Sequence, residues 1–189
     1  NRLVLGDVGS GKTIISFISM YANFLAGYQS VLMAPTEVLA RQHFASAIEY
    51  FKDFHVTIDL LVGSMTKKEK ENVKERLVSG DIDILVGTHA ILEENVSFYR
   101  LGLVITDEQH RFGVKQREIL KSKGDVPDAL YMSATPIPRT YALTLYGDLD
   151  VSFIRHKPSG RKEIITKIKK YSELKDVLMH VLEEIKAGH

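Results

Sequence analysis

The sequence has 189 residues, of which 44% are hydrophobic, which is enough for one globular domain and part of another. Its 25 basic and 24 acidic residues leave a net charge of +1, so composition gives no overall signature of nucleic-acid binding. No run of about 18 apolar residues is present, so we expect no membrane partner. The lack of cysteine excludes disulfides and thiolate metal sites and fits a protein of the reducing cytoplasm.

Short apolar segments alternate with helical segments along most of the chain. Strands are expected at residues 2–5, 30–34, 56–62, 82–86, 101–105, 129–132 and 151–154, and helices at 14–26, 37–54 and 66–78. This alternation predicts an α/β fold with a mostly parallel central sheet between two helical layers. Functional loops of such a sheet gather at the carboxyl ends of its strands.

The character of the sequence changes near residue 157. Pro158 and Gly160 indicate a linker, followed by a predicted strand at residues 164–168 and an amphipathic helix at 172–186. We therefore predict one domain over residues 1–156 and the opening of a second over 157–189. Because the chain begins at Asn1 inside a predicted strand, we also expect it to be a segment of a longer polypeptide.

The loop after the first predicted strand matches the phosphate-loop pattern G-x-x-x-x-G-K-[ST]. Its residues are Gly6, Asp7, Val8, Gly9, Ser10, Gly11, Lys12 and Thr13. The glycines let backbone N–H groups converge on a phosphate chain. Lys12 would hold the β- and γ-phosphates, and the Thr13 hydroxyl is a natural ligand of Mg²⁺. The motif therefore predicts nucleoside triphosphate binding, the alternative being a glycine-rich turn that binds nothing.

An acidic pair, Asp107 and Glu108, directly follows the apolar strand at 101–105. Beside a phosphate loop, the first carboxylate is expected to hold Mg²⁺, directly or through water. The second is expected to polarise the water that attacks the γ-phosphate. The alternative interpretation is a solvated turn or a helix cap.

Five segments resemble motifs I, Ia, Ib, II and III of superfamily-two helicases and translocases. They are residues 6–13, 35–40, 87–90, 107–110 and 133–135. The longer strings at 107–117 and 134–140 resemble the RecG family of branched-DNA helicases and the related Mfd family of translocases. Gln109 favours the RecG family, and the stretch at 146–150 is also similar to it.

The resemblance implies a RecA-like phosphate-loop NTPase fold, with residues 1–156 as the first ATP-binding motor domain of a DNA helicase. Residues 157–189 would then hold a linker and the first strand and helix of a second motor domain. The implied catalytic residues are Lys12, Asp107, Glu108 and His110, and the implied Mg²⁺ ligands are Thr13 and Asp107. The implied coupling residues are Ser133, Ala134 and Thr135, and the implied DNA contacts are Pro35, Thr36, Gly87, Thr88 and His89.

A near-neutral domain can still contact DNA, because helix N-termini offer N–H donors to phosphates. Thr36 is placed for this, and equally for a simple helix N-cap. The basic residues Arg111, Lys115 and Arg117 are suited to DNA or to another domain. The run at 67–71 mixes both charge signs and is expected to be a solvated helix face. Three histidines outside the motifs, His43, His55 and His180, are expected to be ordinary core or surface residues.

The implied cofactors are ATP and Mg²⁺. The implied partners are branched or forked DNA, a second motor domain and a DNA-recognition domain of the same polypeptide, and single-strand-binding protein. Hydrolysis by this segment alone is expected to be very slow, because the second domain would supply arginines to the transferred phosphate. Three functions remain open: a RecG-type branched-DNA helicase, an Mfd-type translocase that displaces stalled RNA polymerase, and a non-motor ATP-binding module.

Overall fold

The computed structural model describes residues 1–108, 112–134, 149–155, 166 and 168–188. The chain divides into two compact units, Asn1–Pro158 and Ser159–His189. This division falls two residues beyond the boundary expected from the sequence. The assignment of the second unit to a second motor domain stays a prediction.

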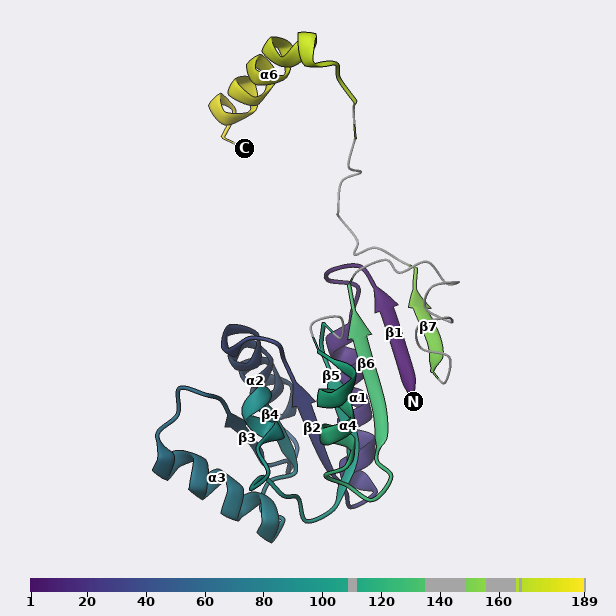
Figure 1. Ribbon diagram of the computed structural model, residues 1–189, viewed down its shortest axis with the longest axis vertical. Coiled ribbons are helices and arrows are strands. Elements are labelled where there is room, and N and C mark those ends of the chain that lie inside the picture. Colours follow the sequence, from purple (N-terminus) through teal and green to yellow (C-terminus); the bar gives the residue numbers. More distant parts are fainter. Residues whose placement is uncertain (109–111, 135–148, 156–165, 167, 189) are drawn as a thin grey trace. The chain divides into compact units, whose positions relative to one another are not determined.

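The first unit is built on one seven-stranded sheet of the order β3-β4-β2-β5-β6-β1-β7 (Figure 1). Its strands are β1 (Arg2–Gly6), β2 (Gln29–Met33), β3 (Ile58–Leu61), β4 (Ile84–Gly87), β5 (Leu101–Thr106), β6 (Asp128–Ser133) and β7 (Asp150–Ile154). Every neighbouring pair among these described strands runs parallel. All their carboxyl ends therefore lie at one edge of the sheet, which is where the motif loops of the sequence begin.

Four α-helices connect or follow these strands in the described part of the first unit. They are α1 (Lys12–Leu25), α2 (Glu37–Phe51), α3 (Lys67–Ser79) and α4 (Val114–Lys121), with a 3₁₀ turn η1 (His89–Leu92) after β4. The helix expected at 37–54 ends at Phe51, three residues early. Helix α4 was not predicted.

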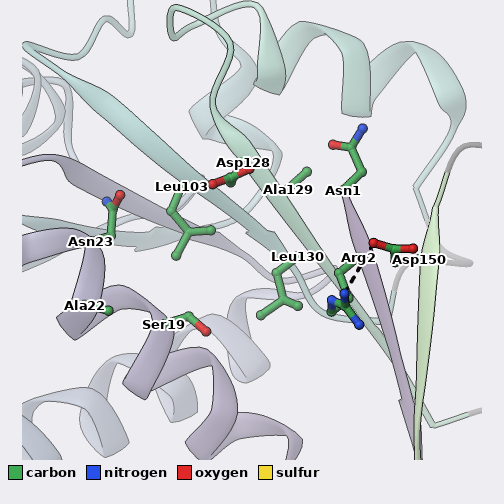
Figure 2. Close-up of a pocket in the computed structure, with 10 residues that line it drawn as sticks. All are labelled: Asn1, Arg2, Ser19, Ala22, Asn23, Leu103, Asp128, Ala129, Leu130 and Asp150. Carbon is green, nitrogen blue, oxygen red and sulfur yellow. Dashed lines mark hydrogen bonds and ion pairs between the residues drawn. The ribbon is translucent and has the colours of Figure 1, made fainter. Parts of the chain in front are cut away.

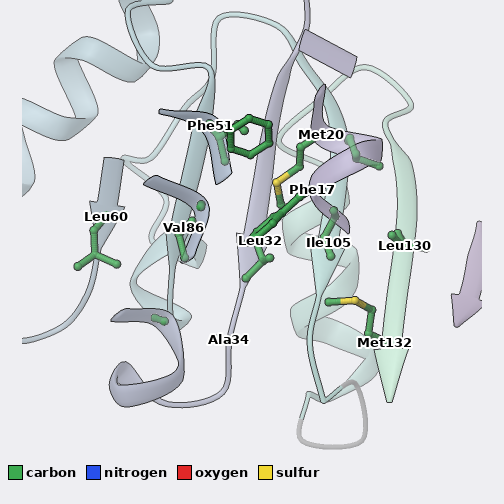
Figure 3. Close-up of a cluster of buried hydrophobic side chains, with 14 of the residues drawn as sticks. Phe17, Met20, Leu32, Ala34, Phe51, Leu60, Val86, Ile105, Leu130 and Met132 are labelled. Atoms are coloured by element: carbon green, nitrogen blue, oxygen red, sulfur yellow. The ribbon is translucent and has the colours of Figure 1, made fainter. Parts of the chain in front are cut away.

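The helices cover both faces of the sheet, which makes three layers. Helices α1 and α2 pack on one face, where Phe17, Met20 and Phe51 lie over Leu32 and Ile105 (Figure 3). On the other face, α3, η1 and α4 cover a second cluster. It includes Val31, Met33, Leu61, Val73, Leu77, Leu85, Ile91, Val104 and Leu120. Successive strand residues alternate between the two clusters, and being buried on both faces is why these strands read as continuous apolar runs.

The buried side chain of Gln29 joins three elements at the opposite edge of the sheet. Its Nε2 donates to the carbonyls of Leu77 and Ile82, at 2.9 and 2.7 Å. Its Oε1 accepts from the N–H of Arg100 at 3.0 Å. The entry to β2 is thus tied to the end of α3 and to the entries of β4 and β5.

The described part of the second unit holds a 3₁₀ turn, η3 (Tyr171–Glu173), and helix α6 (Leu174–Lys186), coloured yellow in Figure 1. The predicted amphipathic helix is confirmed. Of the strand predicted at 164–168, Thr166 and Ile168 are described and lie outside regular structure, and the other three residues lie outside the described part. None of the helices that the structure describes combines the length and apolarity needed to cross a bilayer.

Candidate active site

The phosphate loop turns back on itself between β1 and α1. Gly9 and Gly11 adopt left-handed backbone angles, with φ of 76° and 94°, which other residues rarely accept. The N–H of Ser10 donates to the carbonyl of Asp7 at 3.1 Å, and the Asp7 carboxylate accepts the N–H of Val8 at 2.7 Å. Helix α1 then begins at Lys12, so its free N-terminal N–H groups and positive dipole end face the loop.

The ammonium group of Lys12 lies across this loop. Its Nζ donates to the carbonyls of Gly6 at 2.7 Å and Asp7 at 2.9 Å. A lysine ammonium has three donors, so one remains for an incoming phosphate oxygen. The next residue, Thr13, is half-buried in the first turn of α1, beside the same loop.

Asp107 and Glu108 follow β5 at the same edge of the sheet. The N–H of Asp107 donates to the carbonyl of Met33 at 3.0 Å, so the main chain of Asp107 extends the pairing of β5 with β2. Its Oδ1 accepts the N–H of Glu108 at 2.9 Å. Glu108 has a φ of 50°, a left-handed angle that costs a non-glycine residue about 1 kcal/mol or more. This strained residue is the one expected to orient the attacking water.

A histidine that the sequence analysis treated as ordinary contacts this acidic pair. His43, on α2, is 8% exposed, and its Nε2 lies 2.8 Å from Oδ2 of Asp107. His43 is therefore a core histidine, one of the two settings expected for it, and the structure adds a specific polar partner that the sequence did not predict. One signal was available: Ala40, His43, Ala47 and Phe51 share the buried face of α2, and a polar residue on an apolar face requires a polar partner.

The coupling segment begins at Ser133, the last residue of β6, which lies between β1 and β5 in the sheet. Ser133 is 1% exposed and stands level with Leu5 at the base of the phosphate loop. Ala134 is half-buried, and Thr135 and His110 lie outside the described residues. Ser133 therefore sits between the phosphate loop and the acidic pair, while its coupling role stays a prediction.

The residues expected to contact DNA lie at the carboxyl ends of β2 and β4, at the same edge of the sheet; Gly87 is the last residue of β4, and the others come after β2 or β4. Thr36 and His89 are exposed and Pro35 is half-buried, whereas Gly87 and Thr88 are buried. The N–H of Thr88 donates to the carbonyl of Leu61 at 3.2 Å. The side chain of Thr36 caps α2 by accepting the N–H of Leu39 at 3.3 Å, so its capping role is confirmed. A DNA contact at each of these five positions stays a prediction.

The turn after β3 lies at the same edge of the sheet and contacts α2, a contact that the sequence did not predict. The Ser64 hydroxyl donates to the carboxylate of Glu37, the first residue of α2, and the Arg41 guanidinium lies 2.8 Å from the same oxygen. These hydrogen bonds, that of Ser64 first, hold the pKa of Glu37 below its usual value. A serine after a predicted strand end is the signal that could have placed it.

Helix α4 carries part of the predicted basic segment. Lys115 is exposed, and the Arg117 guanidinium lies 5.7 Å from the centre of the Tyr131 ring. Burial raises the pKa of the Tyr131 hydroxyl, and the charge of Arg117 opposes this shift. Arg111 lies outside the described residues. A cavity of about 450 Å³ is lined by Pro35, His89, Phe112 and Gln116, so the loops after β2 and β4 meet the α4 segment there.

A second cavity, of about 490 Å³, lies at the opposite, amino-terminal edge of the sheet (Figure 2). Ser19 and Asn23 of α1 line it, together with the first residues of β1, β6 and β7, and the ion pair between Arg2 and Asp150 spans 3.3 Å beside it. Since the phosphate loop leaves the other end of β1, this cavity is not the nucleotide site.

The donor set fits Mg²⁺ bound together with a nucleotide. No group of three or more histidine, aspartate or glutamate side chains that could hold a metal occurs in the described part of the chain. Mg²⁺ is commonly held by one or two carboxylates, water and the substrate phosphates, without a full protein cage. The Thr13 hydroxyl and the Asp107 carboxylate, both at the phosphate-loop edge, are hard oxygen donors of this kind.

Comparison with known proteins agrees with this geometry. The family model for DEAD/DEAH box helicases matches residues 1–144. The chain belongs to the DEAD/DEAH box helicase family. The ATP-dependent DNA helicase RecG of Bacillus subtilis is 52% identical over 188 residues, which span 100% of this chain and 28% of that protein. The resemblance to RecG stated from the motifs is therefore confirmed.

The fold of this chain is also found in solved structures of helicases. A structure of RecG bound to a three-way DNA junction matches with a TM-score of 0.82 and 45% identity, over 99% of this chain and 25% of that one. The helicase domain of Hef from Pyrococcus furiosus matches with a TM-score of 0.60 and 22% identity, over 82% of this chain and 35% of that one, which shows the fold alone. The expected RecA-like, three-layer fold is confirmed, and the chain spans about a quarter of the length of its RecG relatives.

Proposed function

We propose that this chain is the ATP-binding motor domain of a DNA helicase that remodels branched DNA, such as forks and four-way junctions, in recombination and repair. One observation carries the proposal. The phosphate loop, the acidic pair and the loops that hold Thr36 and His89 all lie at one edge of a parallel sheet. The similarity to RecG over the full chain supports branched DNA as the substrate.

The residues of the site have separable tasks in this proposal. The third donor of Lys12 and the N-terminal N–H groups of α1 bind the phosphates of ATP. Thr13 and Asp107 would hold Mg²⁺, which neutralises charge on the β- and γ-phosphates when bound. Glu108 orients the attacking water and accepts its proton. Arginines of a second motor domain would complete the site.

The DNA would lie along the loops after β2 and β4. Thr36 is exposed at the N-terminus of α2, where N–H groups and the helix dipole favour phosphate. Contacts of this kind position a strand without reading its sequence and need no net positive charge. A DNA-recognition domain of the same polypeptide and single-strand-binding protein are further proposed partners, and the proposed location is the cytoplasm.

The test uses a full-length protein that carries this chain. Its ATPase rate is measured on linear duplex, forked duplex and four-way DNA of equal length. A strong preference for the branched substrates, lost on Lys12→Ala and retained on Lys68→Ala at an exposed position, supports the proposal. Equal rates on all three, with displacement of stalled RNA polymerase, would favour the Mfd-type translocase. No stimulation by any DNA would favour a non-motor ATP-binding module.

A further inference from the structure

We propose that His43 is a positioning residue for the Asp107 carboxylate and fixes the orientation in which that carboxylate meets Mg²⁺. This inference rests on the proposed ATP site, and it assigns a role to a residue outside the helicase motifs. His43 belongs to α2, whereas Asp107 follows β5, and 64 residues separate them in the chain.

The contact between the two side chains has the geometry of a strong hydrogen bond. Nε2 of His43 and Oδ2 of Asp107 are 2.8 Å apart, and the side chains are only 10% and 13% exposed. An ionised carboxylate only accepts hydrogen bonds, so Nε2 carries the proton and donates it. A hydrogen bond with a charged partner, shielded from water, is stronger than one at the surface.

The second oxygen of the carboxylate is also held. Oδ1 of Asp107 accepts the N–H of Glu108 at 2.9 Å, while Oδ2 accepts from His43. With one donor on each oxygen, rotation of the carboxylate about its terminal bond is restricted. Each oxygen has a further lone pair, so the carboxylate stays able to bind a cation or an ordered water.

His43 acts on the side chain of Asp107 and not on its main chain. The N–H of Asp107 is bonded to the carbonyl of Met33 within the sheet, a contact that does not involve His43. Removing the imidazole would therefore free the carboxylate while the strand stays in register. Groups that hydrogen-bond metal ligands in this way typically change metal affinity by about 10- to 100-fold when removed.

The first experiment measures how nucleotide binding depends on Mg²⁺ in the 189-residue chain. For His43→Ala, we expect the Mg²⁺ concentration that gives half-maximal ATP binding to rise about 10-fold or more. ATP binding in the presence of a chelator should not change. The paramagnetic resonance spectrum of Mn²⁺ bound with ATP should also differ from that of the unmodified chain. His55→Ala, at an exposed histidine, is the matched control and should leave both readouts unchanged.

Two amide variants separate positioning from packing. The amide nitrogen of His43→Gln reaches about as far as Nε2, so it should restore the Mg²⁺ dependence to within about 3-fold of the unmodified chain, whereas His43→Asn is too short and should not. This comparison still reports if His43→Ala unfolds. An unchanged Mg²⁺ dependence in His43→Ala, or equal behaviour of the two amide variants, would overturn the inference. These readouts need no DNA, so failure of the helicase proposal on branched substrates would be seen separately.

Discussion

Gly87 illustrates, at the scale of a single residue, how packing constrains a motif position. It ends β4 and stands opposite Leu61 of β3. A Cβ added there would overlap the carbonyl oxygen of Leu61 and lie 3.0 Å from Cδ1 of Ile91. The absence of a side chain at Gly87 is therefore required by the sheet, whatever the loop beyond it binds.

We expect Gly87→Ala to lower the free energy of unfolding by about 1–3 kcal/mol, because β3 and β4 must separate to admit the methyl group. Urea unfolding of the chain, followed by circular dichroism, measures this. Gly63→Ala is the control, since no atom lies within 4 Å of its added Cβ. A loss at Gly63 as large as that at Gly87 would contradict the packing explanation.

At the scale of elements, the side chain of Gln29 joins the start of β2 to the end of α3 and to the residues before β4 and β5. Replacing it with methionine keeps the side-chain volume but removes three hydrogen bonds. The carbonyl of Ile82 and the N–H of Arg100 lose this partner, and the carbonyl of Leu77 loses one of its donors. Because unsatisfied buried polar groups are costly, Gln29→Met should destabilise the chain by about 2–4 kcal/mol. Thermal unfolding checks this against Gln42→Met, an exposed position on α2 that should change stability by about 0.5 kcal/mol or less.

The Asp83 carboxyl, just before β4, predicts that the stability of the chain depends on pH. Oδ2 of Asp83 accepts the N–H of Thr57 at 2.7 Å, but burial dominates and raises the pKa of Asp83 above its usual 3.8. The folded state therefore binds the proton of the Asp83 carboxyl more tightly than the unfolded state does. Stability contributed by Asp83 therefore falls as the pH rises from 3.8 through the raised pKa, and is constant above it.

The test compares the unmodified chain with Asp83→Asn, which keeps an acceptor and does not titrate. As the pH rises from 3.8 through the raised pKa, the unfolding free energy of the unmodified chain should fall relative to that of Asp83→Asn. Carbon-detected NMR titration of the Asp83 carboxyl reports its pKa directly. A value at or below 3.8 would contradict the dominance of burial.

The sequence predicts elements well where a pattern is local. Most strands were placed to within one or two residues, because parallel strands buried on both faces read as apolar runs that end at glycine or at polar residues. Helix α4 was missed because half of its eight residues are charged and eight residues are too few to show a period; its start is marked only by Gly113 and the side chain of Gln116. The phosphate loop and the acidic pair were predictable for the same local reason.

The rest of the site depends on contacts between distant segments. The pairing of His43 with Asp107 joins residues 64 positions apart, and the pairing of Ser64 with Glu37 joins residues 27 apart. Periodicity shows that His43 faces inward, but it does not show which residue the imidazole contacts there. Likewise, the burial of Gly87 and Thr88 depends on β3, a strand whose position in the sheet the sequence leaves open.

At the scale of the whole molecule, the two units differ in how much they bury. The first unit has a core on both sides of its sheet, whereas α6 and η3 have no buried residues. The buried clusters of the first unit use only residues between Leu3 and Ile154, so residues 1–158 should unfold on their own in a single cooperative transition. Calorimetry of residues 1–158 checks this: the calorimetric and van't Hoff enthalpies of unfolding should agree, and a clear disagreement between them would contradict the prediction.

The rate of ATP hydrolysis, in contrast to the stability of the first unit, should depend on a second motor domain. If arginines of a second motor domain contact the transferred phosphate, the 189-residue chain should release phosphate from ATP at least about 10³-fold more slowly than a full-length protein that carries it. The measurement is DNA-stimulated phosphate release by both proteins under the same conditions. Robust stimulation of the short chain would contradict this prediction.

The pairing of β7 with β1 has a mechanical consequence. β7 is an edge strand that runs parallel to β1 over five paired residues, and its last residue, Ile154, lies opposite Gly6 (Figure 1). The chain leaves Ile154 for the second unit, and Gly6 opens the phosphate loop. Tension along β7 would load the evenly spaced hydrogen bonds of this pair together, in shear, so that no single bond carries the load. The strand that leads into the nucleotide loop would thus also resist any tension that reaches the first unit through β7.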